Sequence, residues 1–232
     1  MSVRTCVITG ASRGIGLATA FRFAKQGCQI VVAARREAEL ATACRQIEAA
    51  GAKCHAIVVD IGQPDAARRL IDAAQQRFGR VDVLVNNAGR APLAPLEKFD
   101  PAEFDRVLAV NVAAIFHTTQ AVWPLMQTQR GGVIINISSR ASVDPFPGFA
   151  VYGASKAWVN IFSQAVADEG RPHNIRVFSV APCAVETTLM RSAFPDFPPD
   201  KALDPADVAE VILRLCGPEF APCSGQTIFV RK

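Results

Sequence analysis

The chain has 232 residues, half of them hydrophobic and a fifth charged, which is enough to bury a full-sized core. The formal net charge is +4, and no run of basic residues exceeds two, which argues against a nucleic-acid surface. No apolar run reaches the roughly 18 residues of a membrane span, and the N-terminus carries no apolar signal-peptide segment. We therefore expect a cytoplasmic protein with no membrane partner.

Seven cysteines are scattered along the chain, without a Cys-x-x-Cys pair and without a histidine at metal-ligand spacing. An odd number of scattered cysteines predicts reduced thiols rather than a disulfide framework or a metal site. This agrees with the cytoplasmic location, and no bound metal is expected.

Short β-branched apolar runs alternate with helical patterns along the whole chain. Strands are predicted at residues 5–9, 29–33, 54–59, 82–85, 133–137, 176–180 and 227–230. Helices are predicted at residues 14–26, 36–50 and 64–78, each followed by a glycine, and at about 207–216. The alternation predicts an α/β fold: a seven-stranded parallel sheet with helices on both faces, in one doubly wound Rossmann-type domain over residues 1–232.

A stretch from residue 194 to residue 205 interrupts this pattern. It contains four prolines, which exclude a continuous helix. It follows the sixth predicted strand, and loops at the carboxyl ends of strands often border the ligand in this architecture. We therefore expect an irregular loop beside the binding site.

A glycine-rich turn joins the first strand to the first helix. It reads Thr-Gly-Ala-Ser-Arg-Gly-Ile-Gly over residues 9–16. Glycines let the backbone approach a pyrophosphate closely, and the helix N-terminus adds unpaired N–H donors and a partial positive charge. The strand–turn–helix context predicts a dinucleotide phosphate site, with a turn chosen only for packing as the alternative.

The spacing Thr-Gly-x-x-x-Gly-x-Gly resembles the short-chain dehydrogenase/reductase family, and the resemblance continues from about residue 4 to residue 230. Further matches follow in the family's order. They are Asp60 after the third strand, Asn-Asn-Ala-Gly at 86–89, Asn111, Ser138-Ser139 after the fifth strand, and Tyr-x-x-x-Lys at 152–156.

The resemblance implies two sets of site residues. The catalytic set is Asn111, Ser139, Tyr152 and Lys156. The cofactor-binding set is Gly10, Ser12, Arg13, Gly14, Ile15, Gly16, Arg35, Asp60, Ile61, Asn87, Ala88, Gly89, Tyr152, Lys156, Pro182, Val185 and Thr187. By resemblance, Asp60 bonds the adenine ring, Thr187 contacts the carboxamide, and Asn111 positions a water that links Lys156 to solvent.

The spacing of Tyr152 and Lys156 has a direct chemical meaning. Side chains four residues apart share one face of a helix, and an ammonium beside a phenol favours the phenolate. With an oxidised nicotinamide nearby, the pKa of Tyr152 is expected to fall from about 10 towards working pH. Tyr152 then acts as general acid in reduction and general base in oxidation.

Ser139 lies 13 residues before Tyr152, and its hydroxyl is expected to hold the reacting oxygen. The resemblance favours Ser139 over Ser138. Taken singly, each of these residues has an ordinary alternative: a packing tyrosine, a solvated lysine, a capping serine.

The end of the second strand bears on which nicotinamide is used. NAD sites commonly place an acidic residue there, but this chain has Ala34 followed by Arg35. Arg35, with Arg13 from the glycine turn, predicts binding of a 2′-phosphate, and hence NADP(H). The alternative is a solvated basic pair at a helix start.

One position departs from the family pattern. After the sixth strand the chain reads Ala-Pro-Cys-Ala-Val-Glu-Thr over 181–187, with Cys183 where the family usually has glycine. A small apolar wall is the favoured interpretation, and a reactive thiol is the alternative. The expected substrate walls at 90–93, 140–149 and 189–197 are rich in Phe, Pro and Leu. They favour a neutral, hydrophobic carbonyl compound.

The predicted function is an NADP(H)-dependent oxidoreductase that acts on a small-molecule carbonyl or alcohol. A non-catalytic nucleotide-binding sensor or scaffold on the same fold is the alternative. An epimerase or dehydratase usually requires a longer carboxyl-terminal region. The resemblance implies a homodimer or homotetramer, with Trp158 either an interface anchor or a core residue. Substrate identity, stereochemistry and direction stay open.

Overall fold

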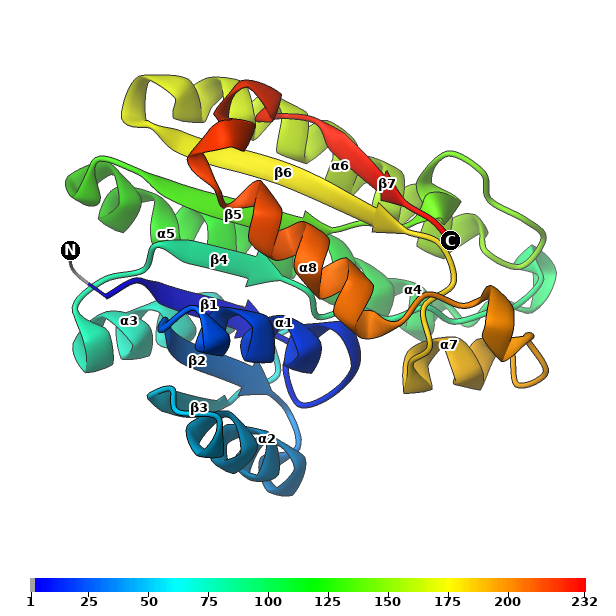
Figure 1. Cartoon of the computed structure of the whole chain (residues 1–232). Helices are drawn as coiled ribbons and strands as arrows, with labels where there is room; N and C mark the ends of the chain where they lie inside the picture. Colours follow the sequence, from blue (N-terminus) through cyan, green and yellow to red (C-terminus); the bar gives the residue numbers. More distant parts are fainter. Residues whose placement is uncertain (1–2) are drawn as a thin grey trace.

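A parallel sheet organises the chain, and the computed structural model describes residues 3–232 of it. The strands are β1 (Thr5–Thr9), β2 (Gln29–Ala34), β3 (Cys54–Val58), β4 (Val83–Asn86), β5 (Gly132–Ile137), β6 (Ile175–Pro182) and β7 (Thr227–Val230). Within the described residues these seven strands run in the order β3-β2-β1-β4-β5-β6-β7 (Figure 1). This is the doubly wound order with one strand added, so the predicted α/β fold is confirmed.

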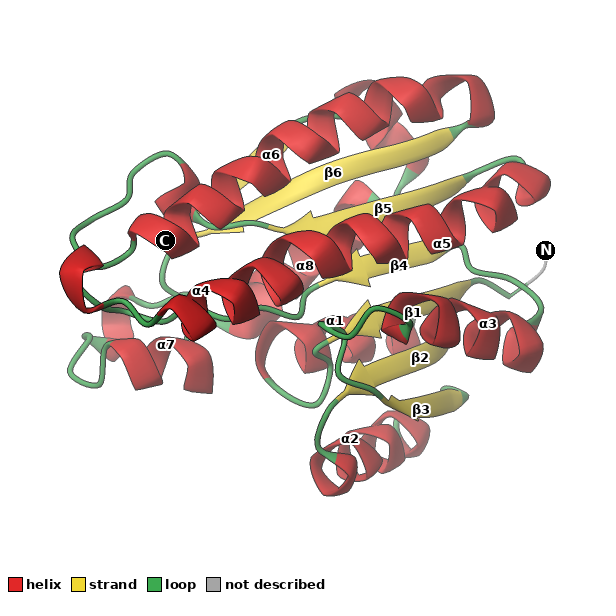
Figure 2. Ribbon diagram, turned by 180° about the vertical axis from the view of Figure 1, so that it is seen from behind, coloured by secondary structure: helices red, strands yellow, loops and turns green. Residues whose placement is uncertain are grey.

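Helices cover both faces of the sheet. They are α1 (Gly14–Lys25), α2 (Glu37–Ala49), α3 (Ala66–Phe78), α4 (Pro101–Leu108), α5 (Ala114–Gln129), α6 (Ala150–Gly170), α7 (Thr188–Ala193) and α8 (Pro205–Leu215). One core lies between the sheet and α1, α2 and α8, which face the viewer in Figure 1. The other lies under α3, α5 and α6, which face the viewer in Figure 2. None of the described helices is long and apolar enough to span a bilayer.

Alternate residues of each strand contribute side chains to the two cores. In β1, for example, Cys6 and Ile8 face α1, whereas Val7 faces the opposite layer, and all three are fully buried. Neighbouring side chains of a strand point to opposite faces, so a strand covered on both sides is apolar throughout. This explains why the strands read as continuous apolar runs in the sequence.

The segment after β6 differs in part from the prediction. Residues 194–205 contain no continuous helix, as expected, but α7 forms just before them and was not predicted. It begins where the Thr187 hydroxyl accepts a hydrogen bond from the Met190 backbone N–H at 3.2 Å. Likewise α8 begins at Pro205 rather than near residue 207, because Asp204 caps the Ala206 N–H and proline fits the first helical turn.

Candidate active site

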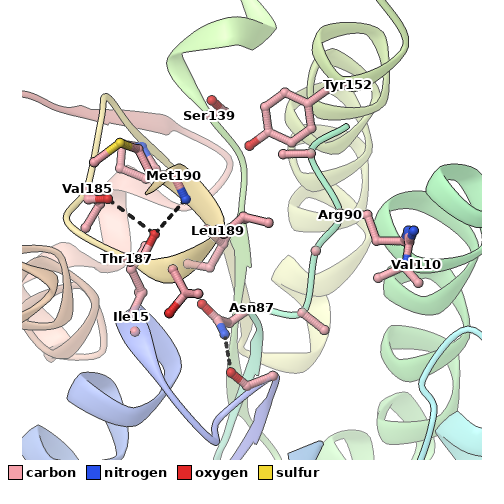
Figure 3. Close-up of a pocket in the computed structure, with 18 of the residues that line it drawn as sticks. Ile15, Asn87, Arg90, Val110, Ser139, Tyr152, Val185, Thr187, Leu189 and Met190 are labelled. Carbon is pink, nitrogen blue, oxygen red and sulfur yellow. Dashed lines mark hydrogen bonds between the residues drawn. The ribbon is translucent and has the colours of Figure 1, made fainter. Parts of the chain in front are cut away.

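A cavity of about 580 Å³ lies at the carboxyl ends of the strands, bordered by the segments that follow β1 to β6. This is where an open α/β sheet binds its ligands. Of the site residues expected from the sequence, the cavity brings together all except Gly16 and Asn111. Figure 3 shows part of its lining, with Tyr152 and Ser139 on one side and Ile15, Asn87 and Thr187 on the other.

The glycine turn allows the protein backbone to approach a bound ligand closely. Gly10 and Gly14 have positive φ angles of 65° and 57°, which disfavour any side chain. A Cβ on Gly10 would lie 2.9 Å from Ala88 Cα, and one on Gly16 would lie 2.5 Å from Asn87 Nδ2. Gly16 is therefore a packing residue behind the turn. No described side chain caps the N-terminus of α1, so its first N–H groups suit a pyrophosphate.

Asn87 ties this turn to the neighbouring strand. Its side-chain amide donates to the carbonyl oxygens of Thr9 at 2.9 Å and Gly10 at 3.0 Å. The Thr9 hydroxyl accepts from the backbone N–H groups of Asn87 and Ala88, both at 3.0 Å. The phosphate turn and the loop after β4 are thus held as one rigid floor.

Two adjacent serines have different surroundings. Ser138 is buried and its hydroxyl donates to the backbone carbonyl of Lys156 at 3.0 Å. Both serines border the cavity, but Ser139 is the more exposed of the two, and its hydroxyl accepts from the Ala141 N–H at 3.2 Å. In Figure 3 the Tyr152 hydroxyl points towards the centre of the cavity, and Ser139 lies on the same side of the cavity. This geometry favours Ser139 as the serine that meets a substrate.

Tyr152 and Lys156 share one face at the start of α6, as their spacing predicts. Burial raises the pKa of Tyr152, and the nearby Ser139 hydroxyl lowers it by less. The Lys156 ammonium is only 3% exposed and donates to the Ile137 carbonyl at 2.7 Å rather than to the phenol. Burial lowers the pKa of Lys156 to about 8. The protein's own groups therefore raise the pKa of Tyr152, whereas the sequence predicted that Lys156 would lower it.

Burial of the charged Lys156 side chain lowers the free energy of unfolding by an amount that can be measured. Its pKa is lower in the folded chain, so the penalty is complete below about pH 8 and is relieved as pH rises towards the ordinary value of 10.5. We expect Lys156→Met to raise the free energy of unfolding by about 1–2 kcal/mol at pH 7, after the lost hydrogen bond is allowed for. The gain should shrink between pH 8 and pH 10.

The measurement is denaturant unfolding of parent and variant at several pH values. Titration of the other buried groups contributes equally to both free energies of unfolding, so it cancels when the two values are subtracted. Lys25→Met, at an exposed position on α1, is the matched control and should show no pH-dependent gain. A Lys156→Met chain that is less stable than the parent at pH 7 would contradict the burial argument.

Asn111 lies behind the cavity on a π-helical turn, Ala109–Ala113, between α4 and α5. Its side chain is completely buried and clamps the backbone of Arg90 from both sides. The Oδ1 atom accepts from the Arg90 N–H at 2.8 Å, and Nδ2 donates to the Arg90 carbonyl at 2.9 Å and to Ser155 Oγ at 3.0 Å. Asn111 is thus a positioning residue in these contacts, and its expected water relay stays a prediction.

The Arg90 side chain, expected in the substrate wall, is pulled towards α4. Its Nε donates to Glu103 Oε1 at 2.9 Å, and Arg106 bonds the other carboxylate oxygen at 2.7 Å. Burial opposes ionisation of Glu103, but the two arginines together hold its pKa below the ordinary value. The pair could not be predicted, because the two partners lie 13 residues apart on different elements.

The far end of the cavity carries the charged residues near β2. Arg13 and Arg35 are exposed and line it, and Ala34 ends the strand beside them. Arg36 is paired with Glu39, its Nη1 lying 2.6 Å from Oε1. Glu39 also lines the cavity. It was not predicted, because an acidic residue at such a site is commonly found at the end of the strand itself, whereas Glu39 lies in the helix that follows.

At the opposite end, Cys183 and Thr187 follow β6. Cys183 is half-buried, lines the cavity and donates its N–H to the Val230 carbonyl at 2.9 Å. Among the described non-glycine residues only Arg130 and Asn174 have positive φ, so the turn at Cys183 does not require glycine. The Thr187 hydroxyl donates to the Val185 carbonyl at 3.2 Å and caps α7, as Figure 3 shows.

We expect Cys183→Gly to give a folded enzyme with an altered substrate range rather than lost activity. The substitution removes a small wall without touching Tyr152, Ser139 or Lys156. The measurement is kcat/KM over a series of ketones of increasing size. Cys223→Gly, at a half-buried cysteine outside the cavity lining, is the control. Abolished activity, together with inactivation of the parent by thiol reagents, would instead identify Cys183 as a reactive thiol.

Aromatic side chains form the wall beside Tyr152. The Phe149 ring lies 5.0 Å from the Tyr152 ring edge-on and 5.7 Å from the Phe194 ring in a stacked arrangement. Phe146 contacts both phenylalanines, at 4.6 and 5.6 Å between ring centroids. The segment before α6 and the segment after α7 therefore meet in an apolar wall next to the phenol.

Three features are typical of α/β enzymes that bind a dinucleotide: the glycine turn, the cavity at the strand ends and the tyrosine–lysine pair. A family model described as short chain dehydrogenase matches residues 4–197. The chain belongs to the short-chain dehydrogenase/reductase family and is an oxidoreductase of that family, whose members bind a nicotinamide cofactor.

Relatives with named activities match nearly the whole chain. The 3-oxoacyl-[acyl-carrier-protein] reductase FabG of Thermotoga maritima is 35% identical, over 97% of this chain and 95% of the relative. The 3beta-hydroxysteroid dehydrogenase 1 of Eggerthella lenta is 34% identical, over 98% and 92%. The crystal structure of 3-ketoacyl-(acyl-carrier-protein) reductase from Brucella melitensis complexed with NADH has 34% identity and a TM-score of 0.91, and the match covers 99% and 97%.

Proposed function

We propose that this chain is an NADP(H)-dependent oxidoreductase that transfers a hydride between the nicotinamide and a carbonyl or alcohol. The substrate is a hydrophobic ketone, aldehyde or oxoacyl compound. One observation carries the proposal: Tyr152 and Ser139 line the same cavity as the phosphate turn, with the buried Lys156 beside them.

The residues around the cavity fit a dinucleotide along its length. Gly10, Gly14 and the free N-terminus of α1 would hold the pyrophosphate, and Asp60 would meet the adenine. Pro182, Val185 and Thr187 border the opposite end, where the nicotinamide would lie. When bound, the nicotinamide supplies the hydride in reduction and accepts it in oxidation.

The chain's own groups manage the proton. In reduction, Tyr152 Oη donates the proton to the carbonyl oxygen, and Ser139 Oγ holds that oxygen within reach. The raised pKa keeps Tyr152 protonated at neutral pH, which suits a general acid. Lys156 adds a buried amine one helical turn away, 5.8 Å from the tyrosine ring centroid, and borders the cavity where it would reach the nicotinamide ribose.

The preference for NADP(H) rests on charge. Ala34 leaves space at the end of β2, and the exposed guanidinium groups of Arg13 and Arg35 border that space. Arginine is suited to bidentate contact with a phosphate. The Brucella relative was crystallised with NADH, so cofactor choice is a point to be measured on this chain itself.

We further propose a single catalytic domain, a cytoplasmic location and a homodimer or homotetramer. The seven free cysteines support a reducing compartment. An apolar surface on α6 supports the assembly: Ile161 is 69% exposed, and the Trp158 ring stacks on the Phe162 ring at 4.6 Å between centroids. Trp158 is half-buried there, which suits an interface residue.

The test is loss of NADPH absorbance with a panel of ketones, aldehydes and oxoacyl thioesters. Steady turnover with a hydrophobic carbonyl is the expected result. Tight NADPH binding without turnover over the whole panel would instead support the second candidate, a nucleotide sensor on the same fold. Absence of any dinucleotide binding would overturn both.

A further inference from the structure

We propose that Glu39 is a specificity-determining residue of the cofactor site: its carboxylate faces the 2′ position of the adenosine ribose and limits the preference for a 2′-phosphate. The inference rests on the proposed function of this cavity as a nicotinamide dinucleotide site. Its consequence is that the enzyme accepts NADH as well as NADPH, although Arg13 and Arg35 favour the phosphate.

The position of Glu39 carries the first step. Glu39 lies in the first turn of α2, and an acid in a first helical turn is often there only because the helix dipole favours it. Glu37 fits that explanation, because it is exposed and does not line the cavity. Glu39 is half-buried and lines the cavity between Arg36 and the glycine turn. Its carboxylate therefore belongs to the binding surface.

The contacts of Glu39 carry the second step. Oε1 accepts from Arg36 Nη1 at 2.6 Å, so one of the basic groups at this end is already neutralised. Arg36 holds the pKa of Glu39 below its ordinary value, and Arg13 and the Ser12 hydroxyl act in the same direction. Glu39 is thus a fixed negative charge at neutral pH, beside the arginine of the phosphate turn.

The balance of charge gives the third step. The end of the cavity near β2 is lined by Arg13, Arg35, Arg36 and Glu39, and Asp60 after β3 adds a further carboxylate where the adenine would lie. A 2′-phosphate there is attracted by Arg13 and Arg35, for which the described residues show no salt bridge, and is repelled by Glu39. A ribose 2′-hydroxyl carries no charge, and a carboxylate can accept a hydrogen bond from it. The same side chain therefore opposes NADPH and tolerates NADH.

The experiment compares Glu39→Gln with Glu37→Gln, which removes the same charge from the same helix outside the cavity. For Glu39→Gln we expect kcat/KM with NADPH to rise roughly tenfold relative to NADH, and the control should leave the ratio unchanged. The gain should shrink as ionic strength rises. In calorimetry, 2′,5′-ADP should bind the variant more tightly by a similar factor, whereas binding of 5′-ADP should stay the same.

Two outcomes would overturn the proposal while leaving the proposed function intact. One is an unchanged ratio in Glu39→Gln, with both cofactors still used. The other is a higher ratio that comes only from loss of NADH activity, without tighter binding of 2′,5′-ADP. A parent chain that binds neither ADP derivative and neither cofactor would instead reject the proposed function.

Discussion

Tyr152→Phe is expected to lower turnover by at least about 100-fold and to leave NADPH binding nearly unchanged. Phenylalanine keeps the edge-on contact with the Phe149 ring, so the wall of the cavity should stay in place. The substitution removes only the hydroxyl, which lines the cavity and which we propose delivers the proton. The measurement is single-turnover reduction of one accepted carbonyl, with the Kd of NADPH determined separately.

Phe149→Leu is the matched control for packing. It disturbs the ring contact with Tyr152 but keeps the phenol, so it should cost much less turnover than the loss of the hydroxyl. Near-normal kcat in Tyr152→Phe would rule out the proton path. Equal losses in the two variants would show that the cavity wall, rather than the hydroxyl, limits the reaction.

Ala34→Asp is expected to invert the cofactor preference from NADPH to NADH. A carboxylate at the end of β2 repels the 2′-phosphate and accepts a hydrogen bond from a free ribose hydroxyl. Arg35→Ala should have a smaller effect of the same sign. A charge-assisted hydrogen bond contributes about 1.5–3 kcal/mol, so the variant should lose roughly ten- to hundredfold in kcat/KM for NADPH and keep its value for NADH.

Both variants should be measured with the two cofactors and one carbonyl substrate at fixed ionic strength, because salt screens the arginines. Arg45→Ala is the control: Arg45 lies on α2, bonds Thr42 at 2.9 Å and does not line the cavity. A parent chain that favours NADH, or an Arg35→Ala chain that weakens both cofactors equally, would remove Arg35 from the phosphate site.

Much of the fold could be predicted because it is encoded locally. The strands are apolar on both faces, and glycines mark the ends of α1, α2 and α3. The phosphate turn and the Tyr152–Lys156 pair are also local patterns, so residue spacing alone is enough to recognise them. Among the helices that were not predicted, α7 has six residues, and its start is capped by the Thr187 hydroxyl.

The properties that could not be predicted arise from tertiary contacts. Glu39 enters the cavity because α2 packs beside the phosphate turn, which no spacing reveals. Lys156 bonds the Ile137 carbonyl, so its effect on Tyr152 differs from the one that two neighbours on a helix would suggest. The shifts in pKa of both groups come from burial, which depends on the complete fold.

The clamp between Thr9 and Asn87 has a consequence for how the chain folds. It joins residues 78 positions apart, and β1 pairs with β4 at the same place. Such long-range parallel pairing closes a large loop before it gains contacts, so it forms slowly. A dinucleotide can bind only after that closure, because the segments that follow β1 and β4 both line its site. Ligand present during refolding should therefore act late, by holding the closed chain and slowing its unfolding, rather than by speeding the first collapse.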